Sequence, residues 1–525
     1  MGPADDDKPP RPGRGLLKRA AIGAALIFTF SAATVASAGL LEVDQLITIV
    51  KTESAPIPGI EGALDNVDPG KPQTILVLGS DRRFVDIKQK NPVRSDTILL
   101  VRLDPSKRVT AIMSIPRDLK VNIRMRNGRF VTDKINAAYA LGGPRLSVQT
   151  VRDLLKVPIN HVVNVNFGGF QRAVNRLGCV FVDVDKDYFN DNNPPNGSQF
   201  DYATIDIDPG YQKLCGMDSL DYVRYRHFDD DFVRAARQQS YLAQAKEQIG
   251  LGRVFGDRKE LLRIFGRYTQ TDIARENTGA ILRLLKLAFE SSKNPIREVR
   301  FRGEIGETYV TITPSNLEKT VNEFRNARAS DGPREGAGTS GSGSGSGSTT
   351  SAGSSRSSGS ATRSRRTSRA QSRSISRAPG VAFSRVEAEN FVAEASTRLS
   401  FPVYYPGARL ARGRYLYGKP RIYDIYDRGR HRHRAYRVVV STGVQGQYYG
   451  IQGMNWKSPP ILDNPSTTMR MRGRTYELFT DGNRLSIVAW RTNRGVYWVS
   501  NTLSRNLTNR QMLAIARSLT RVGDR

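Results

Sequence analysis

Cysteine and histidine are scarce in this sequence, and their scarcity limits the sites that the chain can form. The 525 residues include 2 cysteines, Cys179 and Cys215, and 4 histidines. Two cysteines alone make no zinc site, and His431 and His433 are too isolated to predict a metal centre. The cysteine pair fits an oxidising compartment, where the two thiols either form one disulfide or stay buried and free.

Two common catalytic motifs are missing as well. No GxxxxGK[ST] loop lies near the strand-like runs described below, so nucleotide hydrolysis of the P-loop type is not indicated. No GxSxG elbow occurs either. Acidic residues are outnumbered, since 80 Lys and Arg against 50 Asp and Glu give a formal charge of +30. We therefore expect a polyanionic partner, such as nucleic acid, anionic lipid headgroups or a phosphate-bearing polymer.

One long uncharged run, "AAIGAALIFTFSAATVASAGLL", occupies residues 20–41 behind a basic tail, residues 1–19. A helix of about 20 residues crosses a bilayer, and the flanking Lys and Arg predict a cytoplasmic N-terminus. We therefore expect a single-pass cell-membrane anchor, a stalk over residues 42–71, and an extracytoplasmic remainder. The "ASA" at 36–38 keeps open the alternative of a cleaved signal peptide, which would also export the chain.

The rest of the chain divides into two expected folded domains. Residues 72–328 alternate strand-like and helical runs, which predicts an α/β domain with a mixed central sheet flanked by helices. The expected strands cover 74–80, 96–104, 109–115, 161–167 and 180–185. Residues 329–381 are rich in Gly, Ser and Arg and lack apolar periodicity, so they predict a disordered linker. Residues 382–525 predict a small α+β domain of unknown function.

Three features of the second half allow more than one interpretation. The Arg/Ser part of the linker resembles tails of RNA-binding proteins, but the anchor places it outside the cytoplasm, so no nucleic-acid partner is expected. The tryptophans Trp456, Trp490 and Trp498 could stack on sugars, although aromatic residues of this kind are more often core. The run "DRGRHRHRAYR", residues 427–437, could bind an anionic polymer or form a solvated loop.

The segment "YVRYRHFDDDFVRAARQQ", residues 222–239, concentrates charge. As a strand, its first part would turn Arg224 and Arg226 to the same side. A helix beginning within the aspartates 229–231 would place Asp231, Arg234 and Gln238 on one stripe. The alternative is a surface segment with internal pairs, such as one between Asp230 and Arg234.

Charged residues also mark the ends of three apolar strands, a common place for sites in open α/β sheets. They occur in "LGSDRR", "NPVRSDT" and "SIPRD", and are Asp81, Arg82, Arg83, Arg94, Asp96, Arg117 and Asp118. Arginine suits phosphate oxygens. Carboxylates among such arginines suggest a divalent cation, and Asp81 and Asp96 therefore suggest Mg²⁺ acting at a diphosphate.

The ordered motifs "LGSDRR", "RSDT", "SIPRD", "DKINAAYALGG" and "YVRYRHFDDDFVRAARQQ" resemble those of the LytR-CpsA-Psr family of cell-wall glycopolymer ligases. The resemblance is close over 74–251, and the sequence up to 327 is compatible with it. It implies a phosphotransferase that moves a phosphorylated glycopolymer from a polyprenyl diphosphate carrier to peptidoglycan, with Mg²⁺ as cofactor. Its partners would be the lipid-linked glycopolymer, peptidoglycan and membrane lipid.

The resemblance also implies a role for each matching residue. The diphosphate would be bound by Arg94, Arg117, Arg224, Arg226, Arg234 and Gln238. Asp81 and Asp96 would hold the metal, and Asp231 would orient its arginine neighbours. Asp96, Arg94 and Arg117 would be catalytic, with Asp96 helping to deprotonate the acceptor hydroxyl. Asp118, Lys134 and Asn136 match family positions whose roles stay open, as do those of Asp229 and Asp230.

Two further features follow from the resemblance. Cys179 and Cys215 look like the disulfide of an actinobacterial subgroup. A polyprenyl tail needs an apolar tunnel, which Val163, Val165, Phe167 and Phe170 could line, although such residues are more often plain core.

Two other functions compete with glycopolymer transfer. Water in place of the acceptor hydroxyl would make the protein a polyprenyl-diphosphate hydrolase. A non-enzymatic wall protein that binds anionic polymers would use its charge and its C-terminal domain.

Overall fold

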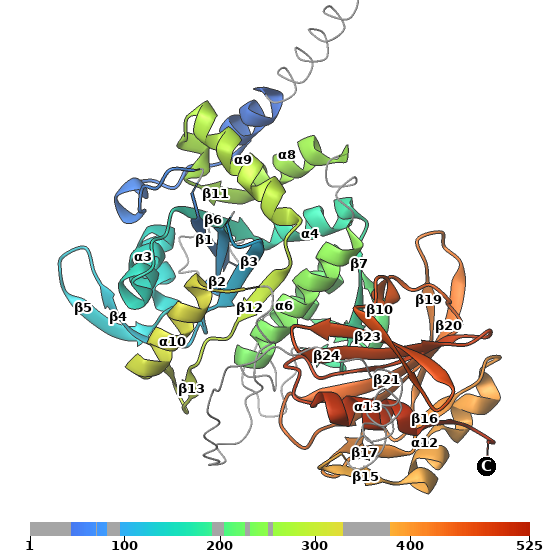
Figure 1. Ribbon diagram of the computed structural model, residues 1–525. Helices are drawn as coiled ribbons and strands as arrows, with labels where there is room; N and C mark the ends of the chain where they lie inside the picture. The colour runs from blue at the N-terminus through green and yellow to red at the C-terminus, as the bar shows by residue number, and fades with distance from the viewer. Residues whose placement is uncertain are drawn as a thin grey trace, which may run out of the picture.

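The computed structural model describes residues 44–69, 71–80, 95–104, 106–191, 204–225, 231–249, 256–328 and 378–524 (Figure 1). The expected anchor, residues 20–41, and nearly all of the expected linker lie outside these ranges. Within them, no helix combines the length and the apolar composition needed to cross a membrane.

A six-stranded mixed sheet forms the centre of the first domain, in the order β11-β6-β1-β2-β3-β12. Its strands are β1 (Gln73–Ser80), β2 (Ser95–Asp104), β3 (Val109–Ser114), β6 (His161–Asn166), β11 (Thr269–Thr271) and β12 (Ile296–Val299). β6 runs parallel to β1 and β12 parallel to β3, whereas the other pairs are antiparallel. The expected mixed sheet is confirmed.

The two faces of this sheet differ in burial because side chains alternate along each strand. One face carries Leu76, Leu78 and Leu100, all fully buried in the core with α3 (Ala137–Leu155) and α10 (Pro314–Arg325). The opposite face carries apolar side chains of intermediate exposure, namely Ile75, Val77, Leu99 and Val101. Helices α8 (Arg258–Tyr268) and α9 (Thr278–Ser292) contact strands of the sheet and lie above it in Figure 1.

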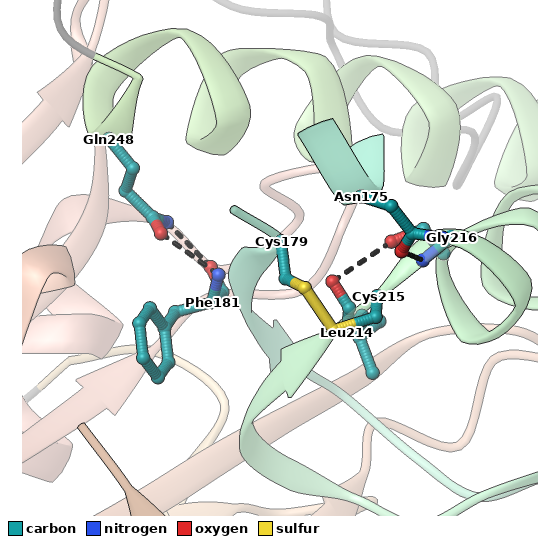
Figure 2. Close-up of a disulfide and its surroundings, with 8 residues drawn as sticks. Asn175, Cys179, Phe181, Leu214, Cys215, Gly216 and Gln248 are labelled. Carbon is teal, nitrogen blue, oxygen red and sulfur yellow. Dashed lines mark hydrogen bonds between the residues drawn. A yellow bond between two sulfur atoms is a disulfide. The ribbon is translucent and has the colours of Figure 1, made fainter. Parts of the chain in front are cut away.

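A small two-stranded sheet of β7 (Val180–Val184) and β10 (Gly210–Leu214) lies apart from the central sheet. A disulfide joins Cys179, just before β7, to Cys215, just after β10 (Figure 2). The side chain of Gln248, the last residue of α6 (Asp231–Gln248), bonds both backbone groups of Phe181, at 2.9 Å to its nitrogen and 2.6 Å to its oxygen. The disulfide therefore holds the start of β7 against the end of β10, and Gln248 holds the free edge of β7.

The helices around the small sheet correct one expectation. Arg224 ends α5 (Gly216–Arg224), so the interpretation of this segment as a strand is wrong for residues up to 224. The segment is rich in residues that favour strands, but Leu220 and Tyr222 bury fully when it is helical, and this packing outweighs local propensity. Tyr225 leaves the helix, and Arg226 lies outside the described residues.

One expected helix end is confirmed. α4 (Phe167–Leu177) ends at Gly178, whose φ of 92° is the left-handed conformation that favours glycine. Phe167, expected as the end of a strand, is instead the first residue of this helix, where Asn166 caps the amide of Gly169 at 3.0 Å. α6 is described from Asp231 onward, whereas Asp229 and Asp230 lie outside the described residues.

Shorter elements complete the first domain. They are β4 (Lys120–Arg124), β5 (Phe130–Lys134), β8 (Tyr188–Asn190), β9 (Ile205–Ile207), β13 (Glu304–Ile305), β14 (Val310–Thr311) and the 3₁₀ turns Glu61–Ala63 and Ile273–Arg275. The first two form a hairpin that projects from the domain in Figure 1.

The C-terminal unit, residues 378–524, is rich in β structure. Its eight-stranded sheet comprises β18 (Arg414–Tyr415), β19 (Arg421–Tyr426), β20 (Arg432–Ser441), β21 (Tyr448–Met454), β22 (Thr467–Met471), β23 (Arg474–Asp481), β24 (Arg484–Arg491) and β25 (Val496–Ser500). Beside it lie β15 (Val381–Phe383), α12 (Arg385–Arg398), β16 (Tyr404–Pro406), β17 (Ala408–Leu410), the turn Pro460–Leu462, α13 (Asn509–Ser518) and β26 (Leu519–Arg521).

Two of the three tryptophans of this unit are buried, and the basic run 427–437 is exposed over residues 428–432 and buried at its end. Trp490 and Trp498 are fully buried core residues, as expected. The basic run 427–437 forms the turn and second strand of the β19–β20 hairpin rather than a free loop, and its last residue, Arg437, is 1% exposed.

The disulfide generates the first prediction. Cys179 and Cys215 are 36 residues apart, and closing a loop of this size removes enough chain entropy from the unfolded state to contribute about 3 to 4 kcal/mol. Replacing both cysteines with serine should lower the free energy of unfolding by that amount, measured by urea unfolding. A reductant should destabilise only the native protein and leave the double variant unchanged.

Candidate functional site

The pairing of β1 with β2 contains a bulge at the end of β1, and Asp96, one of the two expected metal ligands, is the bulged residue. Gly79 pairs with Thr97 and Ser80 pairs with Ser95, so Asp96 is an extra residue between two paired positions. Bulges of this kind re-aim side chains beside functional sites. Asp81 follows β1 directly, although it and the side chain of Asp96 lie outside the described residues, as does Arg94.

Glycine at position 79 allows the two strands to approach each other closely. A Cβ added to Gly79 would lie 3.0 Å from the Cβ of Thr97, which is tighter than ordinary van der Waals contact. The "LGSD" motif therefore keeps the strand ends close to each other.

A second group of charges follows β3. Asp118 lies 3.2 Å from the ammonium group of Lys134 and 3.7 Å from the guanidinium of Arg117. The backbone carbonyl of Arg117 accepts a hydrogen bond from the amide of Asn136 at 3.2 Å. Asp118 and Lys134, whose roles the sequence left open, thus help to position Arg117.

Asn136 itself is 3% exposed, and its side-chain oxygen accepts no hydrogen bond within the described part of the chain. Because an unpaired buried amide oxygen is costly, it suggests a place where a bound group completes the hydrogen bonding.

The third group comes from α5 and α6. Arg224 donates from Nε and Nη2 to Oδ1 of Asp221, at 2.9 and 2.5 Å, and its guanidinium lies 5.8 Å from the ring centroid of Phe167. Burial raises the pKa of the Asp221 carboxyl, and the charge and hydrogen bonds of Arg224 offset this only in part. Arg234 on α6 is 8% exposed.

Gln238 joins this group to the sheet. Its side-chain Nε2 donates to the carbonyl of Val223 at 3.0 Å and makes a longer contact of 3.4 Å with Oγ1 of Thr97. Thr97 directly follows the bulged Asp96. The structure therefore brings Gln238, the end of α5 and the expected metal-binding strand edge together.

Two residues of the site escaped the sequence analysis. Asp221 orients Arg224. The two residues are three positions apart, so their side chains come close only when the segment is helical. Arg237 is fully buried, and its Nη2 donates to the carbonyl of Tyr225 at 2.5 Å, one residue before Arg226. The sequence signal that could have identified Arg237 was its position next to Gln238 in the motif "RAARQQ".

The residues expected to line a lipid tunnel do not all lie together. Val163 and Val165 sit on β6 and pair with Val77 and Gly79; Val163 is buried, whereas Val165 is of intermediate exposure. Phe167 lies near Arg224, as described above. Phe170 packs instead against Tyr241, with ring centroids 5.9 Å apart, in the core around the small sheet.

Among the described residues, His161, Asp272 and Glu276 are close enough to hold a metal ion. They lie at the opposite end of β6 from Val165. Asp272 already bonds the ring of His161 and the amide of Val162, both at 2.7 Å, so this group is a structural pairing.

Comparison with known proteins places the first domain in a family. The LytR_cpsA_psr family profile matches residues 44–326. The polyisoprenyl-teichoic acid–peptidoglycan teichoic acid transferase TagU of Oceanobacillus iheyensis is 31% identical over 263 residues, which are 48% of this chain and 74% of TagU. The enzyme of the same name from Enterococcus faecalis is 26% identical over 50% of this chain and 81% of its own.

Solved structures are also similar in part. The structure described as TagT bound to LI-WTA has 26% sequence identity and covers 52% of this chain and 97% of its own, with a TM-score of 0.39. Since the family profile matches more than half of the residues, the chain belongs to the LytR_cpsA_psr family.

Proposed function

We propose that this protein transfers a phosphorylated glycopolymer from a polyprenyl diphosphate carrier to peptidoglycan. The relatives named as teichoic acid transferases support the reaction class. The contact of Gln238 with Thr97 carries the proposal within this chain. It brings the end of α5 and α6, with Arg224 and Arg234, to the strand end where the proposal puts the diphosphate and its metal.

The arginines would bind the diphosphate. Arg224 is held by Asp221, Arg234 is buried on α6, and Arg117 is fixed by Asp118. Side chains fixed in advance and partly removed from water stabilise developing phosphate charge more strongly than mobile, hydrated ones. Arg94 and Arg226 would complete the set from the sequence motifs.

In the transfer step, the acceptor hydroxyl oxygen forms a bond to the phosphorus nearest the glycopolymer. The bond from that phosphorus to the bridging oxygen breaks, and polyprenyl monophosphate leaves with the bridging oxygen. Asp96 would take the proton of the hydroxyl. Positioning and charge neutralisation are most of what phosphoryl transfer requires of a protein.

Mg²⁺ fits the donor set of this site. Asp81 and Asp96 supply carboxylate oxygens, which Mg²⁺ prefers together with phosphate oxygens and water. The adjoining strand ends support their joint use. When bound, the ion would neutralise charge on the diphosphate.

The proposal includes a membrane location. Residues 20–41 would anchor the chain, with the catalytic domain outside the cytoplasm near its lipid-linked donor. Apolar side chains of intermediate exposure on one face of the sheet, namely Val77, Leu99 and Val165, would accommodate the prenyl tail.

Alanine substitution tests the arginine site. Arg234→Ala should lower the rate of transfer from a lipid-linked donor to peptidoglycan by about 100-fold, because a preorganised cation at the diphosphate is lost. Arg263→Ala, on the exposed surface of α8 where Arg263 pairs with Glu260, is the matched control and should keep its activity.

The same assay separates the competing functions. Absence of ligated product while the donor is demonstrably bound would rule out transfer. Phosphate release that needs no acceptor, and that acceptor does not reduce, would indicate a hydrolase. Absence of transfer by the native protein, together with cellular function that Arg234→Ala leaves intact, would favour a non-enzymatic wall protein.

Chelation tests the metal. Removing divalent cations with EDTA should lower transfer at least tenfold, and added Mg²⁺ should restore it. Asp81→Asn should raise the Mg²⁺ concentration needed for half-maximal rate, because one carboxylate ligand is lost. Transfer that is insensitive to EDTA would contradict a role for Mg²⁺ and leave the arginine site untouched.

A further inference from the structure

We propose that the C-terminal unit is a fixed part of the diphosphate site, which it shapes by holding α6 and Tyr225, the C-cap residue of α5, in place. The proposal concerns a part of the chain outside the family match, which ends at residue 326. It assigns to residues 378–524 a positioning role toward the first domain rather than the role of a freely tethered binding module. Figure 1 shows α6 between the central sheet and the C-terminal unit.

A buried ion pair crosses between the two units. Nη1 of Arg437 on β20 lies 2.8 Å from Oδ1 of Asp183 on β7, and their side chains are 1% and 9% exposed. Gly450 on the neighbouring strand allows this geometry, since a Cβ there would lie 2.0 Å from the guanidinium carbon of Arg437. Separating the two units would leave each of these buried charges without its partner, which is strongly unfavourable.

An apolar core surrounds this pair. Phe181 and Tyr211 of the small sheet share a buried cluster with Trp498 and other residues of the C-terminal unit. The ring centroids of Tyr211 and Trp498 are 5.7 Å apart. The backbone amide of Tyr211 donates to the hydroxyl of Tyr423 at 2.7 Å, and its own hydroxyl accepts from the amide of Ile461 at 3.1 Å. A shared core with satisfied polar groups is typical of a permanent interface.

From this core the contact extends to α6. Val233 and Ala236 are almost fully buried and cluster with Leu503 of the C-terminal unit. A Cβ added to Gly446 would lie 2.7 Å from Cγ2 of Val233, so backbone of the C-terminal unit reaches the helix directly. Arg234 and Gln238 lie on the same stretch of helix. A shift of α6 would therefore move both diphosphate-binding side chains.

Tyr225, the C-cap residue of α5, is linked to the C-terminal unit through Lys186. The ammonium group of Lys186 lies 4.8 Å from the ring centroid of Tyr188, 4.9 Å from that of Tyr225 and 5.9 Å from that of Tyr448. Tyr448 belongs to β21 of the C-terminal unit, whereas Tyr225 follows Arg224 and precedes Arg226. Cation–π contacts of this kind stabilise the position of Tyr225, which directly follows Arg224.

These contacts make Arg437, Leu503 and Tyr448 positioning residues. They touch α6, β7 and the Lys186 cluster, and would act on substrate only through Arg224, Arg234 and Gln238. Loss of the interface should loosen α6 and weaken diphosphate binding, with the catalytic side chains all still present.

The test uses the full chain with a specific protease site inserted into the "GSGSGSGS" stretch, residues 341–348. The interface variant combines Asp183→Asn with Arg437→Met. The matched control combines Glu477→Gln with Arg491→Met, which removes a 2.8 Å ion pair lying wholly within the C-terminal sheet. Leu503→Ala serves as a milder second interface variant if the first does not fold.

After cleavage, the native protein and the control should elute from gel filtration as one species, whereas the interface variant should separate. Hydrogen exchange of backbone amides in residues 231–248 should become at least tenfold faster in the separated first domain. Its affinity for geranylgeranyl diphosphate should fall at least tenfold, while the cleaved control should keep the affinity of the intact chain.

Three results would overturn the proposal. In the first, the two halves of the cleaved native protein separate on gel filtration. In the second, the interface variant separates but hydrogen exchange in α6 is unchanged, and in the third, both interface variants still co-elute with unchanged exchange. Faster exchange in a protein that never binds the prenyl diphosphate would support the positioning role and would count against the proposed transfer function instead.

Discussion

The side-chain amide of Gln238 connects parts of the chain that are 141 residues apart, and the candidate site depends on this connection. On one side it bonds the last turn of α5, where Arg224 is held by Asp221. On the other side it contacts Thr97, next to the bulged Asp96. Gln238 can donate to both the Val223 carbonyl and the Thr97 hydroxyl because its side-chain nitrogen carries two hydrogens. The relative positions of the site residues therefore depend on how α6 is placed against the strand end that carries Asp96.

Burial of positive charge is the cost of this arrangement, and the surrounding groups offset it. Arg234, Arg237 and Arg437 are all at least nine-tenths buried. Arg437 has the carboxylate of Asp183, and Arg237 has the carbonyl of Tyr225 and the faces of three tyrosine rings. Such partners keep each guanidinium charged and fixed where water is excluded. A rigid cationic surface of this kind suits a diphosphate, whose charge must be met in a defined geometry.

Much of the first domain could be predicted from sequence because its patterns are local. Alternating apolar residues gave the strands of the central sheet, and Gly178 marked the end of a helix. Local propensity failed at residues 222–224, where strand-favouring residues form a helix since tertiary packing buries Leu220 and Tyr222. The role of Asp221 was hidden for the same reason, because its distance from Arg224 depends on the helical conformation.

The sequence by itself determined the family, the set of charged residues and the two folded regions, because motif order and apolar periodicity are properties of the chain alone. Only the tertiary structure decided which charges meet. It showed that Lys134 reaches Asp118, that Gln238 reaches Thr97, and that Arg437 of the basic run 427–437 is buried against Asp183. The physical reason is that these contacts join different elements of the fold, and that the pairing of Arg437 with Asp183 depends on desolvation that exists only once both surfaces are packed.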